Sequence, residues 1–340
     1  MADRDDVARK AGVSGATVSR VFNKPGTVAD KTRERVLRAA EELNYHPNAI
    51  ARNFVKGRSG NIGVVMPYIP GVHIFSAYYF SEILSGIGEA LKENGYNLLL
   101  FFYNAGQETE GAYLKCFVGG RVDGCVLLGT YRDDENLLRL KDSGFKFCLV
   151  NNYILGSGIS FIDADNFKGS YDATAYLISL GHKRIAFLNG PLRYANSADR
   201  LAGYSRAMED NCLPVEKDCL LEGNYGRKSG YAAASRLLKI HELPTAVFAA
   251  NDRMAAGLVQ GLKEKGVRVP EDIAVVGFDD SDIATVLEPQ LTTVRVPFFE
   301  MGKRCGAEFV KIVNGESRQG FEIFIEPKLI VRSSCGSKPK

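Results

Sequence analysis

Apolar residues in the first part of the chain recur at the three- and four-residue spacing of amphipathic helices. Two stretches, 5–12 and 14–23, show this spacing, with the apolar positions Val7, Ala8, Ala11, Val18, Val21 and Phe22. Gly12 suits the left-handed position that ends a helix, and the Ser14 hydroxyl can accept the free amides that begin the next one. The pattern therefore predicts two short helices that share a small core and are joined by a tight turn.

A third amphipathic helix is predicted over residues 31–43, capped by Asp30, and it completes a three-helix head. A fourth helical stretch, 47–56, begins with a proline that suits a first helical turn and ends before a Gly-Ser-rich joint. Isolated helices become marginal in water only at about 12–15 residues. We therefore expect residues 47–56 to fold only when another surface holds them.

From residue 61 onward, short apolar and β-branched runs alternate with stretches of helical spacing. Such alternation predicts strand-helix units and a parallel, doubly wound sheet. The pattern restarts near residue 169, which predicts two α/β lobes. The expected strands are 62–66, 97–102, 125–128, 147–150, 184–188, 246–249 and 273–277, and the expected helices are 79–94, 110–118, 136–142, 169–180, 199–210, 229–239 and 254–265.

Charge is distributed unevenly between these parts. Residues 1–58 contain 12 Lys and Arg against 7 Asp and Glu, whereas the remainder contains 31 against 33. A basic head on a slightly acidic body indicates a polyanion as the partner of the head. The chain is 45% hydrophobic and 24% charged, which is typical of a globular protein with a sizeable core.

Several classes of function have little support. The seven cysteines form no Cys-x-x-Cys pair and the four histidines are scattered, so we expect free thiols and no metal site. The acidic start lacks a secretory signal and no apolar run could span a bilayer, so a cytoplasmic protein without membrane contact is expected. Residues 226–229 miss the spacing of a phosphate-binding loop, and residues 143–146 match Ser-x-x-Lys without its partner motifs. We expect no catalytic residues and no cofactor.

Short segments across the chain resemble the LacI/GalR family of bacterial transcription regulators. In the head they are Asp6–Ala8, Ala11–Ser14, Thr17–Val21, Thr32–Val36, Glu42–Tyr45 and Pro47–Arg52. In the body they are Asp165–Asn166, Leu180–Phe187, Gly190–Pro191, Arg200–Tyr204, Ala250–Ala255, Val276–Asp280 and Pro289–Val294. The resemblance implies an α/β protein with a helix-turn-helix head, a hinge helix and a two-lobed, periplasmic-binding-protein-like body.

The resemblance also implies domain boundaries. Residues 1–46 would form the DNA-binding domain, 47–60 the hinge helix and linker, and 61–340 the effector-binding and dimerisation domain. Within that last domain, the first lobe would comprise about 61–158 and 293–320, and the second about 159–292 and 321–333.

The second helix supplies the expected base-reading positions, which are Gly15, Ala16, Thr17, Arg20 and Asn23. Gly15 and Ala16 are small, which leaves Thr17 and Arg20 as the main readers. Arg20 can bond a guanine bidentately, a contact worth about 1–3 kcal/mol of discrimination; a phosphate contact or a solvated position is the alternative. Arg4 stands where the family usually has an apolar residue, so we expect the start of the first helix to be less well anchored.

In the hinge, the resemblance implies minor-groove contacts from Ala51, Asn53 and Phe54. Family members usually push a leucine between the central base pairs, and Phe54 occupies that position here. A phenylalanine also serves as a wedge that kinks the duplex. The alternative is that Phe54 packs on its own domain.

Polar and aromatic residues near strand ends are candidates for a small-molecule site, because ligands of open α/β sheets bind at the carboxyl ends of strands. Arg200, Asn251 and Asp279 carry planar groups that suit neighbouring sugar hydroxyls. The full set of candidates is Tyr79, Asn152, Tyr194, Asn196, Arg200, Tyr225, Asn251, Asp252 and Asp279. Alternatives remain: Asp252 and Asp280 also suit helix caps, Arg200 suits a buried ion pair, and each tyrosine suits the edge of the core.

Together these features predict a transcriptional repressor that binds double-stranded, pseudo-palindromic operator DNA as a homodimer. A small effector between the lobes would alter the spacing of the hinge segments and so the affinity for DNA. Sugars are the commonest effectors in the family, and a purine or other corepressor is the first alternative. A sugar-binding transport protein would need an export signal and no basic head, and a cytosolic sugar-binding protein or enzyme is the remaining rival.

Overall fold

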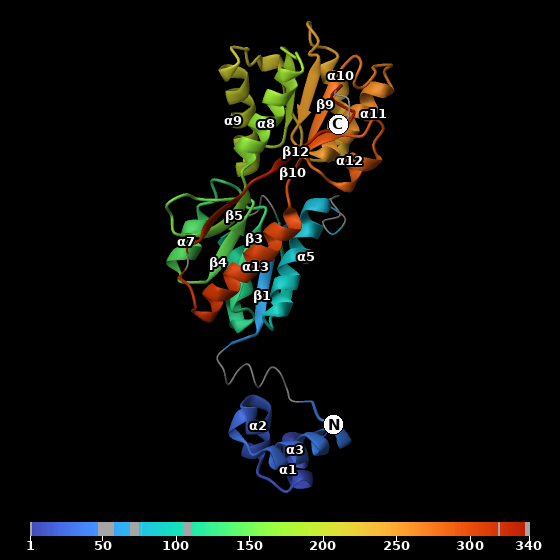
Figure 1. The fold of residues 1–340 in the computed structure, drawn as a ribbon. Coiled ribbons are helices and arrows are strands. Elements are labelled where there is room, and N and C mark those ends of the chain that lie inside the picture. Colours follow the sequence, from blue (N-terminus) through green and yellow to red (C-terminus); the bar gives the residue numbers. More distant parts are fainter. Residues whose placement is uncertain are drawn as a thin grey trace. The chain divides into compact units, whose positions relative to one another are not determined.

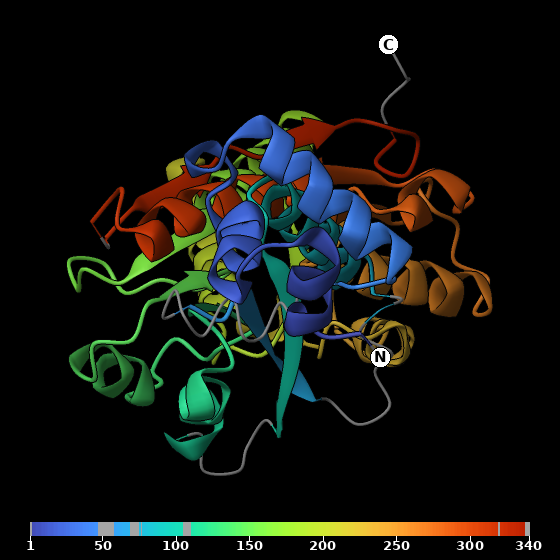
Figure 2. The same cartoon turned by 90° about the horizontal axis from the view of Figure 1, so that it is seen from below.

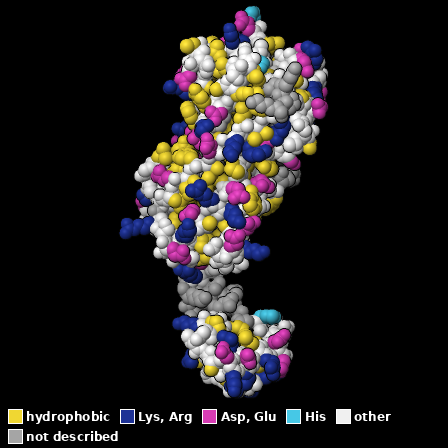
Figure 3. Space-filling view, in the orientation of Figure 1, with side chains coloured by type: hydrophobic (Ala, Val, Ile, Leu, Met, Phe, Trp, Pro, Cys, Tyr) yellow, Lys and Arg dark blue, Asp and Glu magenta, His cyan; other side chains and the backbone are white. Residues whose placement is uncertain are grey.

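The structure is a computed structural model of the chain, and it describes residues 2–46, 58–68, 75, 77–104, 110–318 and 320–336. The chain divides into two compact units, a head comprising Met1–Gly60 and a body comprising Asn61–Lys340 (Figure 1). Over the visible face of the body, side chains of both charges are interspersed (Figure 3). No helix among the described residues has both the length and the apolar character that crossing a membrane requires.

The head is a bundle of three helices packed around one another (Figure 2). They are α1 (Arg4–Ala11), α2 (Gly15–Asn23) and α3 (Asp30–Glu42), with the 3-10 turn η1 (Pro25–Thr27) after α2. Each helix contributes a completely buried valine to the shared core, namely Val7, Val18 and Val36. Gly12 is left-handed with φ 61°, and the Ser14 hydroxyl accepts the Thr17 amide at 3.2 Å. The predicted tight turn between α1 and α2 is therefore present.

Two helix ends differ from expectation. Asp3 caps α1 in a reciprocal capping box with Asp6, so α1 is well anchored although Arg4 replaces an apolar residue. Asp30 does not cap α3, because Ala29 occupies the cap position without a side-chain bond. Asp30 is instead the first helical residue, where a carboxylate favours the helix dipole, and it pairs with Arg33 at 3.0 Å.

The first lobe of the body contains an all-parallel sheet in the order β11-β5-β4-β3-β1-β2. Helices α5 and α13 pack together on one face, and α6 and α7 lie on the other. The elements are β1 (Asn61–Tyr68), α5 (Tyr78–Glu93), β2 (Asn97–Asn104), α6 (Glu110–Phe117), η3 (Val118–Gly120), β3 (Gly124–Leu128), α7 (Asn136–Asp142), β4 (Phe147–Val150), β5 (Ser160–Ala164), α13 (Phe298–Asn314) and β11 (Glu322–Ile325).

The second lobe repeats this plan with the order β12-β10-β9-β8-β6-β7, in which only the β10–β12 pair is antiparallel among the described strands. Helices α8 and α9 pack as one pair, and α10 and α11 as another. The elements are α8 (Asn166–Ser179), β6 (Ile185–Asn189), α9 (Ala195–Asp210), η4 (Lys217–Cys219), β7 (Leu220–Glu222), α10 (Arg227–Leu237), β8 (Ala246–Ala249), α11 (Asp252–Lys263), β9 (Ala274–Asp279), α12 (Asp282–Val286), β10 (Thr292–Arg295) and β12 (Lys328–Ile330).

Strand pairing shows that the chain crosses between the lobes a few residues away from the positions expected from the sequence. Residues 160–164 and 322–325 were expected in the second lobe without a predicted strand, but they form β5 and β11, which pair with each other in the first sheet. Strand β10 belongs to the second sheet, although most of it was expected in the first lobe. The crossings therefore follow β5, β10 and β11. Local hydrophobic patterning identifies a strand but not the sheet that accepts it, which is why these edges were misplaced.

Close backbone packing fixes α13 on α5. A Cβ atom on Gly86 of α5 would lie 2.0 Å from the Phe299 carbonyl oxygen, and one on Gly302 of α13 would lie 2.3 Å from the Ile83 carbonyl oxygen. Only glycine permits this approach, and the two helices pack backbone to backbone as a result. Helix α13 follows a lobe crossing, so this packing ties the crossing to the core of the first lobe.

Candidate functional site

In the head, α2 presents one exposed stripe of side chains. Val18 and Val21 face the core, whereas Ala16, Arg20 and Asn23 are exposed. These three positions are separated by four and three residues, so they lie on one face of the helix. A recognition helix needs such a face to reach base edges in a major groove. The structure thus brings three of the five predicted base-reading positions together.

The other two positions serve the joint between α1 and α2. A Cβ atom on Gly15 would lie 2.9 Å from Arg4 Nε and 3.0 Å from Asp5 Oδ1, so glycine lets the start of α1 approach closely. The Thr17 hydroxyl lies 3.0 Å from the Ser14 hydroxyl, and Thr17 is half-buried. Arg20 is therefore the long hydrogen-bond donor of the exposed stripe. The predicted hinge contacts Ala51, Asn53 and Phe54 lie outside the described residues.

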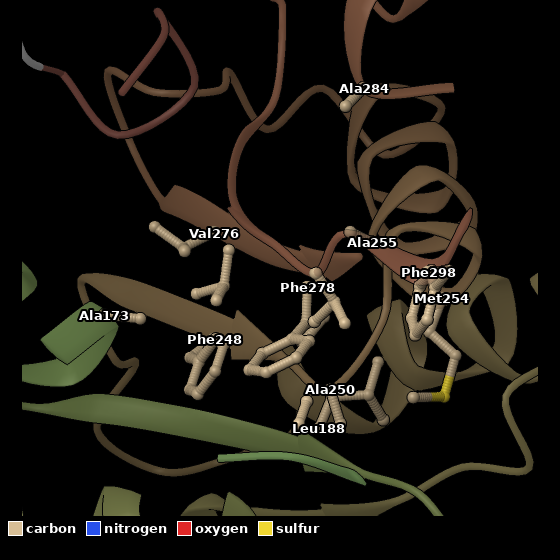
Figure 4. Close-up of a cluster of buried hydrophobic side chains, with 14 of the residues drawn as sticks. Ala173, Leu188, Phe248, Ala250, Met254, Ala255, Val276, Phe278, Ala284 and Phe298 are labelled. Carbon is tan, nitrogen blue, oxygen red and sulfur yellow. The ribbon is translucent and has the colours of Figure 1, made fainter. Parts of the chain in front are cut away.

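In the second lobe, Arg200 is held rigidly at the ends of several strands. Its side chain is only 3% exposed, its Nε donates to Asn166 Oδ1 at 2.8 Å, and its Nη1 donates to the Ala250 carbonyl oxygen. Its guanidinium carbon lies 3.7 Å from the centre of the Phe278 ring, a cation-π contact on the buried cluster in Figure 4. Arg200 forms no salt bridge with any described residue, so the ion-pair alternative is not supported.

Asp279 ends β9 and adopts a left-handed backbone, with φ 115°. No described residue donates a hydrogen bond to its carboxylate. Burial raises the pKa of Asp279 well above its ordinary value, and the nearby Arg200 charge opposes that shift. Asp279 is half-buried, so its carboxylate remains open to a hydrogen-bond donor from outside the protein. Asp279 is thus an available hydrogen-bonding group beside Arg200.

Asn251 and Asp252 begin α11, and their roles differ from expectation. Asn251 is the cap, because its Oδ1 accepts the Met254 amide at 2.9 Å while its Nδ2 donates to the Tyr225 carbonyl oxygen at 3.1 Å. The cap alternative for Asp252 is therefore wrong. Asp252 is completely buried, and its carboxylate accepts hydrogen bonds from within the protein.

These bonds link the start of α11, the segment between β9 and α12, and strand β10. Asp252 Oδ2 accepts the Ser281 amide at 2.7 Å and the Ser281 hydroxyl at 3.0 Å, and its Oδ1 accepts the Thr293 hydroxyl at 2.6 Å. Burial raises the pKa of Asp252 to about 7, and these hydrogen bonds oppose that shift. Asp280 likewise caps no helix, because it pairs with Arg295 and Arg332, each at 2.6 Å.

Tyr225 contacts two other candidate residues, Asn196 and Tyr194. Its hydroxyl donates to Asn196 Oδ1 at 3.0 Å and lies 2.5 Å from the Ser197 hydroxyl. A Cβ atom on Gly190 would lie 2.2 Å from the Tyr225 ring, so glycine makes room for the ring. The Tyr194 ring lies 6.3 Å from that of Tyr225, centre to centre. These residues therefore form one connected polar and aromatic wall.

The two candidates in the first lobe, Asn152 and Tyr79, differ in the hydrogen bonding of their polar side-chain atoms. Asn152 is completely buried, and its Nδ2 donates to the Thr130 hydroxyl at 2.7 Å while its Oδ1 accepts the Tyr153 amide at 2.9 Å. It supports the loop after β4. The Tyr79 hydroxyl, in contrast, is buried without a hydrogen-bond partner among the described residues. Burial raises the pKa of Tyr79 well above its ordinary value.

Contacts across the two lobes involve residues that sequence reasoning missed. The Tyr153 hydroxyl of the first lobe lies 2.9 Å from both carboxylate oxygens of Asp199 on α9. The Arg193 guanidinium of the second lobe lies 3.6 Å above the centre of the Tyr131 ring. No local pattern marks these side chains, because the two members of each pair belong to different lobes and are distant in sequence. We refer to Tyr131, Tyr153, Arg193 and Asp199 as the interlobe contacts.

Asp163 is a further residue that the sequence analysis missed. It lies in the completely buried strand β5, where a carboxylate within an apolar run was the available signal. Its Oδ1 accepts the Ala164 amide at 2.7 Å and Asn166 Nδ2 at 3.1 Å, but its Oδ2 has no partner among the described residues. Burial raises the pKa of Asp163 to about 8. Asp163 and Arg200 share Asn166 as a hydrogen-bond partner.

The same division of the chain emerges from comparison with known families. The family described as bacterial regulatory proteins, lacI family, matches residues 5–48. The family described as periplasmic binding protein-like domain matches residues 174–335. Catabolite control protein A of Priestia megaterium is 34% identical over 313 residues, which cover 92% of each chain. The chain belongs to the LacI family.

Other LacI-family members are similar over nearly the whole chain. The HTH-type transcriptional repressor PurR of Vibrio atlanticus is 33% identical over 339 residues, or 98% of each chain. The lac repressor dimer bound to operator and the anti-inducer ONPF has a TM-score of 0.87 at 28% identity, covering 98% of this chain and 99% of that one. The regulator CelR in complex with cellobiose has a TM-score of 0.76 at 34% identity, covering 98% and 100%. This LacI-family protein is therefore a DNA-binding transcriptional repressor.

Proposed function

We propose that a small polyhydroxylated solute, a sugar, binds between the two lobes of this repressor and sets its affinity for operator DNA. The observation that carries the proposal is the Asp279 carboxylate, which lies at the end of β9 without a described partner. In an open α/β sheet this is the edge at which ligands bind. The Arg200 guanidinium next to it has five N–H donors, and two different nitrogens already hold it in place.

This pair of groups matches the chemistry of adjacent hydroxyls. A carboxyl oxygen accepts from one hydroxyl of a sugar while the guanidinium donates to the next, and both groups are planar. Tyr194 and Tyr225 offer flat apolar surfaces for the faces of the ring. Asn196 supports Tyr225 through its hydrogen bond at 3.0 Å. Tyr79 would contribute its unpartnered hydroxyl from the first lobe.

Three of the original candidates take supporting roles in this proposal. Asn152 and Asp252 are completely buried and bonded within their own lobes, so we assign them to positioning the loops around the solute. Asn251 caps α11 and holds the Tyr225 carbonyl group, and it positions the Tyr225 segment. The direct contacts that we propose are Arg200 and Asp279, with the tyrosines around them.

The interlobe contacts provide the coupling to DNA. A solute that prefers the lobe arrangement in which Tyr153 bonds Asp199 stabilises that arrangement by its differential affinity for the two states. In the homodimer that we propose, residues 1–46 form the DNA-binding domain, 47–60 the hinge and linker, and 61–340 the effector-binding and dimerisation domain. Two α2 helices would read the half-sites of a pseudo-palindromic operator, with Arg20 as the principal base contact. Residues 47–56 would order in the minor groove, where Phe54 would act as the wedge.

The proposal is tested by a thermal-shift screen of the full chain against a panel of neutral sugars and nucleosides, followed by gel shifts with the operator. We expect one sugar to raise the melting temperature and to change operator affinity. Asp279→Asn should lose that response while the unliganded melting temperature stays close to that of the parent. A sugar that protects parent and variant equally would contradict the assigned site.

A purine is the second candidate, and an aromatic cluster in the first lobe favours it. The Tyr79 ring lies 4.7 Å from that of Phe80 and 5.2 Å from that of Phe298, centre to centre. Edge-to-face rings of this kind can accept a flat base. If nucleosides or bases protect the protein and sugars do not, the purine replaces the sugar in the proposal. In that case Phe80→Leu should weaken the response.

A further inference from the structure

Two thiols of the first lobe lie unusually close together. The sulfur atoms of Cys116 on α6 and Cys125 on β3 are 3.0 Å apart, and both residues are completely buried. A disulfide bond is about 2.0 Å long, so the two sulfurs need to move by only about 1 Å to become bonded. The pair therefore has a geometry in which a covalent bond requires little rearrangement.

The backbone brings these sulfurs together by a tight return of the chain. After α6, Gly119 and Gly120 adopt left-handed conformations with φ 75° and 63°, and the chain then enters β3. On the neighbouring strand β1, a Cβ atom on Gly63 would lie 2.8 Å from Cys125 Sγ. Glycine at that position leaves the room that the sulfur occupies. The space around the pair is thus shaped by the backbone itself.

The two thiols also differ in acidity. Cys125 Sγ donates a hydrogen bond to Cys116 Sγ, and this bond lowers the pKa of the Cys116 thiol from its ordinary value. Burial raises the pKa of the Cys125 thiol. Cys116 Sγ itself donates to the Tyr113 carbonyl oxygen at 2.7 Å, a bond that its thiolate would give up. The thiolate is the reactive form of cysteine, and because the Cys116 thiolate would accept the Cys125 hydrogen bond, we assign the first attack to Cys116.

We propose that Cys116 and Cys125 are a thiol-modification site that a hydroperoxide oxidises to an intramolecular disulfide. The Cys116 thiolate attacks a peroxide oxygen, the O–O bond breaks, and the released alkoxide or hydroxide takes up a proton. This gives a sulfenic acid on Cys116. The Cys125 sulfur then attacks that sulfur, and the hydroxyl group leaves as water with the remaining thiol proton. Two electrons pass from the two sulfurs to the peroxide.

Access to the buried pair requires a local opening. Cys116 lies in the last turn of α6, and helix ends fray, so an opening confined to this turn would expose the pair without global unfolding. A hydroperoxide is small enough to enter such an opening. Once formed, the disulfide would fasten α6 to β3 on the face of the first sheet opposite α5 and α13.

The same lobe contains a matched comparison. The sulfurs of Cys148 on β4 and Cys305 on α13 are 3.6 Å apart, which is ordinary contact, and both residues are completely buried. Burial raises the pKa of Cys148 well above its ordinary value. This second pair lacks the short distance, and one of its cysteines lies on α13, which is packed backbone to backbone on α5. We expect it to stay reduced under conditions that oxidise the first pair.

The experiment exposes the full chain, with Cys212→Ser to remove the exposed thiol, to hydrogen peroxide. The remaining free thiols are then alkylated after denaturation, and peptides are mapped by mass spectrometry. We expect the loss of two alkylatable thiols per chain and one linked peptide pair containing Cys116 and Cys125. Reduction before alkylation should restore both thiols.

Cys116→Ser and Cys125→Ser should each abolish the linked pair, and circular dichroism checks that they fold. If either variant does not fold, the peptide map of the Cys212→Ser protein still decides the matter. The proposal fails if both thiols stay fully alkylated, if Cys116 stops at a sulfinic acid, or if the linked peptides contain Cys148 or Cys305. None of these readouts depends on the identity of the effector or the operator.

Discussion

The head and the body place the side chains that we assign to recognition in opposite environments. In the head, Arg20 extends from an exposed stripe, and the valines beneath it form the core. In the body, Arg200 is only 3% exposed and is bonded to Asn166 and to the Ala250 carbonyl group. Recognition and stability are therefore separable in the head but coupled in the body. Substitutions in the two regions should show this difference directly.

The largest effect should follow the replacement of Arg200. Arg200→Ala removes two hydrogen bonds and the cation-π contact with Phe278, and it takes the Arg200 donors away from Asn166 Oδ1 and the Ala250 carbonyl oxygen. Losses of this kind cost about 3 kcal/mol or more of unfolding free energy. Urea denaturation measures that loss, and calorimetry should show no binding of the effector found by the screen.

Arg206→Ala is the matched control, because Arg206 lies on the same helix with its side chain exposed and paired with Asp210 at 2.8 Å. An exposed ion pair contributes at most about 1 kcal/mol. If Arg200→Ala were as stable as Arg206→Ala, the coupling of stability and recognition in the body would be refuted.

The second prediction concerns the pH dependence of the unfolding free energy, to which a buried carboxyl group of the body should contribute. Burial raises the pKa of Asp163 from 3.8 to about 8. Between these values the native protein retains a proton that the unfolded chain has lost, so this group reduces stability progressively as the pH rises through that window, and no further above about 8. The slope is at most about 1.4 kcal/mol per pH unit.

Asp163→Asn should remove this slope, and its gain in stability over the parent should grow from pH 5 to pH 8, as measured by urea denaturation at each pH. Asp30→Asn, which removes an exposed carboxylate of the head that pairs with Arg33, is the control substitution. Parallel pH profiles for the parent and Asp163→Asn would show that Asp163 does not titrate in this window.

A third prediction tests the head. Arg20→Ala should weaken discrimination between the operator and a variant operator by about 1–3 kcal/mol, because a bidentate guanine contact is lost. The melting temperature should not change, since the side chain is exposed. Gel shifts with both duplexes measure the discrimination. Arg38→Ala, at an exposed position on α3, is the control that removes equal charge; equal effects of the two variants on discrimination would assign Arg20 to phosphate contacts.

The smallest effect should come from the interlobe contacts. Tyr153→Phe removes the hydroxyl that bonds Asp199 across the lobes, and we expect about 1 kcal/mol weaker effector binding, which titration calorimetry can measure. Tyr171→Phe removes a similar bond, to Asp210 at 3.1 Å, but within the second lobe. It should leave effector affinity unchanged. If both variants bind the effector equally, the Tyr153 contact does not couple the lobes.

Predictions from the sequence succeeded best where neighbours along the chain supply the structure. The three head helices, the Ser14 cap and the left-handed Gly12 depend on local spacing and backbone preference, and all are present. The two α/β lobes also follow from local alternation. Strands β5, β7, β10, β11 and β12, each of three to five residues, were not among the expected strands. The lobes of β5, β10 and β11 were misassigned because pairing partners are distant in sequence.

The amino-acid sequence alone identified the side chains whose chemistry suits ligand binding. It did not show which of these polar groups remain available for hydrogen bonds with a ligand. Arg200, Asn251, Asp252 and Asp279 all have suitable groups, and the folded chain leaves only the Asp279 carboxylate without a described partner. Helical spacing and capping act over a few residues and can be read along the chain. Hydrogen-bond partners come from different strands and lobes, so the availability of a polar group depends on which segments the fold brings into contact.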